Sequence, residues 1–93
     1  MSENVTYVNP LGKWVAQQRE RRKLSRKAFA ERAAIGQWTA KRLEDGIGRA
    51  NFQTLVAVFR VLGNPPRRVL RGLPPDERAR VIAAARMARR EEV

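Results

Sequence analysis

Residues 25–46 read SRKAFAERAAIGQWTAKRLEDG, and this stretch decides the fold. Ser25 is a good N-cap because its hydroxyl can accept a hydrogen bond from a free N–H of the first helical turn, so a short helix is expected over residues 26–33. After three further residues, a second short helix is expected over residues 37–45. Gly46 follows it and suits the left-handed position at which helices commonly end. The stretch therefore predicts two short helices joined by a tight turn.

The side chains of this stretch divide into an inner and an outer set. In a helix-turn-helix motif the first helix must bring a small residue against its partner, and Ala30 meets that demand. The inner positions are apolar, namely Phe29, Ala33, Ile35, Ala40 and Leu43. The outer face of the second helix presents Gln37, Trp38, Lys41 and Arg42. Glutamine and arginine can form paired hydrogen bonds with base edges, so residues 37–45 have the chemistry of a recognition helix.

The rest of the chain is expected to be helical as well. Apolar spacing and stop signals predict further helices over residues 11–23, 52–62, 67–72 and 76–91. Residues 1–10 carry no helical period and are read as an N-terminal arm. We therefore expect an all-α protein with a compact four-to-five-helix DNA-binding domain over residues 11–73. Its motif occupies residues 26–45, and a basic, alanine-rich C-terminal helix follows within residues 74–93.

The composition narrows the range of functions. The 93 residues include 20 Lys and Arg against 9 Asp and Glu, a net charge of +11, and neither His nor Cys. These absences exclude a Cys/His zinc site, a disulfide framework, and Ser-His-Asp or Cys-His triads. No catalytic residue, metal or cofactor is assigned, and an enzyme is not expected. The positive excess favours a polyanionic partner.

The positive charge falls on two separate parts of the chain. Residues 13–49 hold 11 basic and 4 acidic residues, and residues 60–90 hold 9 basic and 2 acidic ones. The first share coincides with the predicted motif and supports it. The second share falls on a segment whose partner the motif does not explain.

The stretch Leu11–Leu62 resembles the Cro and lambda-repressor type of helix-turn-helix proteins, the xenobiotic-response-element-like family. The matching residues are Arg19, Leu24-Ser25, Phe29-Ala30, Ile35, Leu43-Glu44, Gly46, and Leu55 to Leu62-Gly63. This resemblance implies that Gln37, Trp38 and Arg42 read bases. It also implies phosphate contacts from Arg26 and Arg49, and a partly buried ion pair between Arg19 and Glu44.

Several roles within this picture have alternatives. Lys27 and Lys41 join Arg26 and Arg49 as a group of phosphate-binding cations, any one of which could instead be solvated. Trp38 either contacts a thymine methyl or sugar, or packs against the arm or a second subunit.

Two positions depart from the family pattern. Ala34 stands where the turn usually has glycine, which would cost roughly 1 kcal/mol if that residue is left-handed. Gly36 stands where serine or threonine usually precedes the recognition helix, and it is a weaker N-cap. These departures bear on the docking angle more than on the fold.

The C-terminal helix is the most ambiguous element. Val81, Ala84, Ala85 and Ala88 form a stripe of small apolar residues on one face. The stripe could pack on the domain's own core, form a homodimer or bind a protein partner. The arginines around it could contact phosphate, whereas a largely alanine face is poorly suited to lying on a membrane.

These observations together predict a sequence-specific regulator of transcription that binds double-stranded DNA. A small phage-type or mobile-element repressor, cytoplasmic and associated with the nucleoid, is the expected form, and it would act by occupying its operator. The alternative is the DNA-binding antitoxin of a toxin–antitoxin pair, whose C-terminal helix would bind a protein toxin. A nucleoid or RNA-binding protein that uses charge alone is a further alternative.

Overall fold

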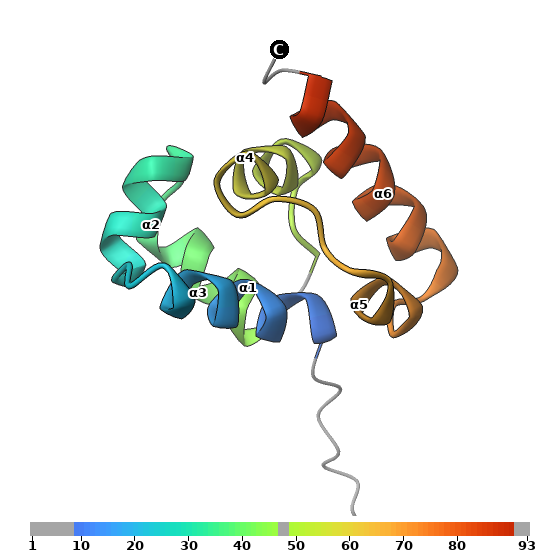
Figure 1. Ribbon diagram of the computed structural model, residues 1–93, viewed down its shortest axis with the longest axis horizontal. Helices are drawn as coiled ribbons and strands as arrows, with labels where there is room; N and C mark the ends of the chain where they lie inside the picture. Colours follow the sequence, from blue (N-terminus) through green and yellow to red (C-terminus); the bar gives the residue numbers. More distant parts are fainter. Residues whose placement is uncertain (1–8, 47–48, 91–93) are drawn as a thin grey trace, which may run out of the picture.

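The computed structural model describes residues 9–46 and 49–90, and these residues form six helices and no strand (Figure 1). The helices are α1 (Pro10–Arg21), α2 (Arg26–Ala33), α3 (Gln37–Asp45), α4 (Phe52–Leu62), α5 (Arg67–Arg71) and α6 (Pro75–Arg90). The predicted all-α fold is confirmed. Pro10, which the sequence placed in the arm, is the first residue of α1, and the rest of the arm up to residue 8 lies outside the described residues.

Helix α4 forms the centre of the core. Its Leu55, Val56, Val58, Phe59 and Leu62 are buried. It lies between α2 on one side and α6 on the other, above α1 in the view of Figure 1. Trp14 of α1 packs against Phe59, with the ring centroids 6.3 Å apart and the planes inclined at 59°. None of the helices in the described part of the chain has the length and apolar composition to cross a membrane.

Helix α6 is part of the same core. Its most extensive contact is with α4, and the stripe of Val81, Ala84, Ala85 and Ala88 is buried there. Small side chains let the two helices approach closely, which explains why so much alanine can still build a core. Of the three roles left open for this stripe, packing on the domain's own core is the one that the structure shows, so these four side chains are not free to contact a second subunit or a protein partner.

The turn between α2 and α3 has the two irregular positions that the sequence indicated. Ala34 is left-handed, with φ 57° and ψ 42°, and it is exposed. Gly36 is the N-cap of α3 and offers no side chain to the first turn. Ser25 caps α2, since its Oγ accepts a hydrogen bond from Ala28 N at 3.0 Å. Ala30 is buried between the helices of the motif.

Helix α1 approaches the end of α3 closely, at a glycine. A Cβ atom on Gly12 would lie 2.3 Å from the carbonyl oxygen of Leu43 and 2.9 Å from that of Glu44. Backbone atoms cannot yield at such distances, so any side chain at Gly12 would push the two helices apart. The sequence analysis did not single out this residue, because its role depends on how the two helices cross.

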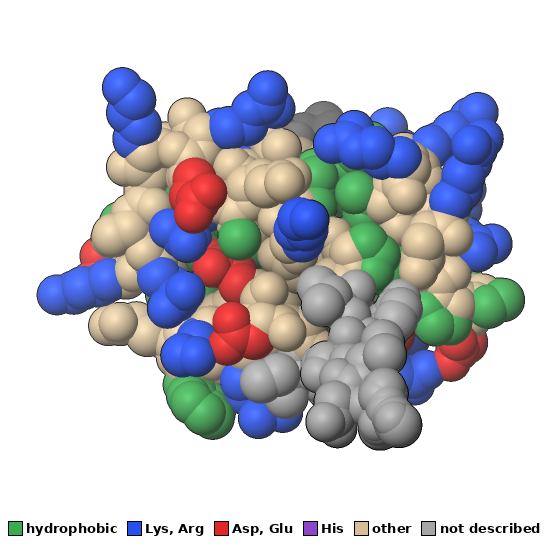
Figure 2. Space-filling view, turned by 90° about the horizontal axis from the view of Figure 1, so that it is seen from below, with side chains coloured by type: hydrophobic (Ala, Val, Ile, Leu, Met, Phe, Trp, Pro, Cys, Tyr) green, Lys and Arg blue, Asp and Glu red, His purple; other side chains and the backbone are tan. Residues whose placement is uncertain are grey.

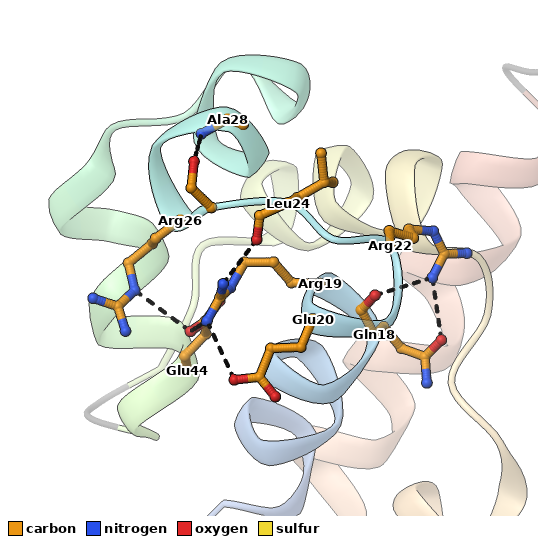
Figure 3. A network of polar contacts seen from close by, with 9 residues as sticks. Gln18, Arg19, Glu20, Arg22, Leu24, Arg26, Ala28 and Glu44 are labelled. Carbon is orange, nitrogen blue, oxygen red and sulfur yellow. Dashed lines mark hydrogen bonds and ion pairs between the residues drawn. The ribbon is translucent and has the colours of Figure 1, made fainter.

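An ion pair joins the same two helices (Figure 3). Arg19 donates from Nε to Glu44 Oε2 at 2.6 Å and from Nη2 to Oε1 at 3.1 Å. The side chains are 12% and 3% exposed, respectively. The bidentate hydrogen bond to Glu44 raises the pKa of Arg19 above its usual value. Arg19 Nη1 also donates to the carbonyl oxygen of Leu24 at 2.9 Å. One guanidinium therefore connects α1, the segment before α2, and α3.

The left-handed Ala34 predicts that Ala34→Gly stabilises the protein. Glycine removes the left-handed strain but gives the unfolded chain more conformational freedom, so the net gain should be about 0.5–1 kcal/mol. A thermal melt should then show an increase of roughly 3–6 °C. Ala79→Gly is the matched control, because Ala79 is exposed within α6 and should lose about 1 kcal/mol. A lower melting temperature for Ala34→Gly would contradict this explanation.

The ion pair predicts an asymmetry between single and double substitutions. Arg19→Met alone leaves the Glu44 carboxylate buried with only Arg26 near it, and should cost on the order of 3–5 kcal/mol in unfolding free energy. The double variant Arg19→Met with Glu44→Leu should recover much of that loss, because no buried charge remains. Urea unfolding measures both. Equal losses of unfolding free energy in the single and double variants would show that the loss does not come from an unpaired buried charge.

Candidate nucleic-acid interface

Helix α3 presents a polar face to solvent because its apolar face is fixed to the core. Ala40 and Leu43 are buried, while Gln37, Trp38, Lys41 and Arg42 are exposed on the opposite side. The ion pair at Glu44 holds the last turn against α1. The helix is therefore fixed along its inner side, and the four residues that the sequence singled out lie on its free side.

Trp38 and Arg42 form a pair on this face. The guanidinium carbon of Arg42 lies 5.8 Å from the centroid of the Trp38 ring, within range of a cation–π interaction. The ring is 68% exposed, which is unusual for so large an apolar side chain. The contact between the two side chains follows from their i, i+4 spacing on the helix. Sequence analysis assigned both residues to base reading but did not anticipate that they touch.

Three of the four cations assigned to phosphate have carboxylate partners in the molecule. Arg26 Nε lies 3.4 Å from Glu44 Oε1. Lys41 Nζ donates to Asp45 Oδ2 at 2.8 Å, which holds the pKa of Asp45 below its usual value. Lys27 is exposed and forms no ion pair within the described residues. Each paired cation would have to exchange its carboxylate for a phosphate in order to contact DNA.

The remaining cation, Arg49, is held by the start of α6. Its Nη2 pairs with Asp76, and its Nε lies 3.4 Å from Glu77 Oε1. The pKa of Asp76 is held below its usual value, first by the backbone N–H of Glu77 and then by Arg49. Arg80 donates to the carbonyl oxygen of Ala50 at 2.8 Å. The segment after α3 is thus tied to α6 at two points.

A hollow of about 380 Å³ separates the recognition helix from this segment. Arg42 and Thr39 line it from α3, and Arg49, Asn51 and Glu77 line the other side. Asp76 and Glu77 lie in the first turn of α6, where the helix macrodipole favours acidic side chains. Their contact with Arg49 spans 27 residues of sequence, and no local pattern predicts it.

The comparisons with known proteins agree with this geometry. Residues 15–69 match the model of the helix-turn-helix family of the Cro/C1 type, which covers more than half of the chain and ends before α6. Comparison with curated proteins and with solved structures gives no match. The chain therefore belongs to the Cro/C1-type helix-turn-helix family and is a DNA-binding regulator of transcription.

Proposed function

We propose that this regulator is a small repressor of the phage or mobile-element type, which acts by occupying its operator. Helix α3 enters the major groove with Gln37, Trp38 and Arg42 toward the base edges. The observation that carries this proposal is the exposed Trp38–Arg42 pair beside Gln37, on a helix whose other side is fixed by the Arg19–Glu44 ion pair. Such a helix presents preorganised contacts to the groove.

Each of the three side chains has a definite chemical role in this arrangement. Arg42 can donate two hydrogen bonds to O6 and N7 of a guanine, and Gln37 can bond to N6 and N7 of an adenine. The Trp38 ring lies against Arg42 and offers apolar surface to a thymine methyl group or a sugar. Stacking on Trp38 limits the rotamers of Arg42, so less conformational entropy is lost when the guanine is bound.

The surrounding cations would fix the position of the protein on the duplex. Arg26, Lys27, Lys41 and Arg49 would contact phosphates, which position the protein without reading sequence. Because Asp76 already neutralises Arg49, phosphate has to displace it. We infer that this competition reduces binding to any sequence alike, and so weakens nonspecific occupancy of DNA.

The base-reading role of Arg42 predicts a change at one base position. Site selection from a random DNA pool with Arg42→Ala should show relaxed preference at one position and a loss of roughly 1–3 kcal/mol on the wild-type site. Arg86→Ala, on exposed α6 surface, removes the same charge and should leave the selected motif unchanged. An unchanged motif for Arg42→Ala would remove this residue from the reading surface.

The proposed competition between Asp76 and phosphate for Arg49 predicts that substituting Arg49 weakens DNA binding and that substituting Asp76 strengthens it. Arg49→Gln should weaken binding to all sequences and reduce the slope of log affinity against log salt by about 0.9. Asp76→Asn should strengthen binding to all sequences about two- to fivefold, because Arg49 then keeps only its longer contact with Glu77. When Asp76→Asn is added to the Arg49→Gln variant, it should not change the affinity further. Fluorescence anisotropy with a labelled duplex measures each affinity, with Glu31→Gln at an exposed position of α2 as the charge-matched control.

If Asp76→Asn strengthens binding equally well in the absence of Arg49, the gain comes from net charge. The proposal that Asp76 competes with phosphate would then be wrong, whereas the proposed base-reading role of α3 would be unaffected.

A further inference from the structure

Five exposed cations on α1 and α5 lie outside the proposed reading face. Helix α1 contributes Lys13 and Arg21, and α5 contributes Arg67, Arg68 and Arg71. We call these five residues the α1–α5 ridge. Within the described part of the chain, none of them forms a hydrogen bond or an ion pair. The ridge therefore differs from the cations around α3, most of which have a carboxylate partner.

Three of the ridge cations line two adjoining hollows. A hollow of about 520 Å³ is lined by Gln17, Arg21 and Arg68, and also by Glu20. A second hollow of about 330 Å³ continues it past Lys13, again beside Gln17 and Arg68. Glu20 is the one carboxylate at this groove, and its Oε2 lies 3.9 Å from Nη2 of Arg19. The groove thus has three cations and two glutamine side chains in its lining.

The ridge cations at the start of α5 do not stabilise that helix, although those in the last turns of α1 and α5 lie where the macrodipole favours a cation. Arg67 and Arg68 begin α5, where the helix macrodipole is positive, and the first turn of α5 contains no acidic residue. By contrast, α6 begins with Asp76 and Glu77, which the macrodipole favours. Unpaired like charges so close together are unfavourable in the free protein, and a bound polyanion would remove that cost.

The ridge lies on the side of α1 away from α3. Gly12 and Arg19 of α1 face α3, whereas Lys13, Gln17 and Arg21 face the grooves beside α5. In the face shown in Figure 2, Lys and Arg side chains gather along the upper edge as well as on the left. A duplex seated on α3 is therefore separated from the ridge by the thickness of α1.

We propose that the α1–α5 ridge binds the phosphate backbone of a second DNA segment, so that one molecule joins two duplex segments. Helix α3 reads one segment, and the ridge holds the other without regard to sequence. Lys13 and Arg21 are eight residues apart, or about 12 Å along the helix, and a duplex of that length carries about seven phosphate charges. Amide side chains such as Gln17 commonly bond to phosphate oxygens. This inference goes beyond the proposed repressor function but rests on DNA binding by α3.

A two-duplex capture experiment tests the ridge. A short duplex of random sequence is fixed to beads and loaded with the full-length protein, and the retention of a second, fluorescent duplex is measured at several salt concentrations. The ridge variant combines Lys13→Gln, Arg21→Gln and Arg68→Gln. The control combines Arg86→Gln, Arg89→Gln and Arg90→Gln, which remove the same charge from exposed positions of α6. Circular dichroism verifies that both variants are folded.

Wild type and the α6 control should retain the second duplex, and the ridge variant should retain at least about tenfold less of it. The slope of log capture against log salt should fall by about 2.7 for the ridge variant, because three phosphate contacts are lost. Binding to the first duplex should persist in all three proteins.

Three results would overturn the proposal. Wild type could bind the first duplex and capture no second one, in which case the ridge has another partner. The ridge variant could capture as well as the control, as expected if a dimer joined duplexes through two α3 faces. The control could lose capture equally, which would assign the effect to net charge. Failure of wild type to bind even the first duplex would instead reject DNA binding by α3, and the ridge proposal with it.

Discussion

The position of the recognition helix depends on one buried carboxylate. Glu44 receives two hydrogen bonds from Arg19 of α1 and a contact from Arg26 of α2 (Figure 3). Arg19 in turn binds the carbonyl oxygen of Leu24, just before α2. Three elements that are separate in sequence therefore meet at a single charge. We infer that this shared charge helps to set the angle of α3, together with the apolar contacts of Ala40 and Leu43.

Helix α6 changes the electrostatics of the family motif as well as its core. It lies beyond residue 69, where the family match ends, and it covers α4 on one side. Its first residues also hold Arg49, which we place at the DNA backbone. The same helix thus supplies apolar packing at its middle and a carboxylate competitor for phosphate at its start. The positive charge that Arg49 can offer to DNA is consequently smaller in this chain than it would be in residues 15–69 alone.

Local features were predictable from the sequence, whereas the Arg19–Glu44 pair is the long-range contact that the family resemblance implied. The bounds of α2, α3 and α4 follow from the cap at Ser25, from Gly46 and from apolar spacing, and they agree with the structure. Helix α1 begins one residue earlier than expected because its cap is Asn9, whose side chain accepts from Leu11 N, and it ends before the left-handed Lys23. The contact of Arg49 with α6 and the close approach at Gly12 depend on helix crossing, which no local pattern contains. The small-residue stripe of α6 was undecided because close packing within one molecule and between two molecules requires the same residue types.

The burial of α4 beneath α6 determines where this protein can be divided. A fragment that ended at residue 69, the limit of the family match, would expose the face of α4 that Val81, Ala84, Ala85 and Ala88 cover. It would also free Arg49 from its carboxylates. We therefore expect the smallest fragment that folds by itself to be larger than residues 15–69 and to extend at least to Ala88. A hybrid repressor built by grafting this recognition helix onto another scaffold would have to import α6, or replace both its apolar face and its acidic start.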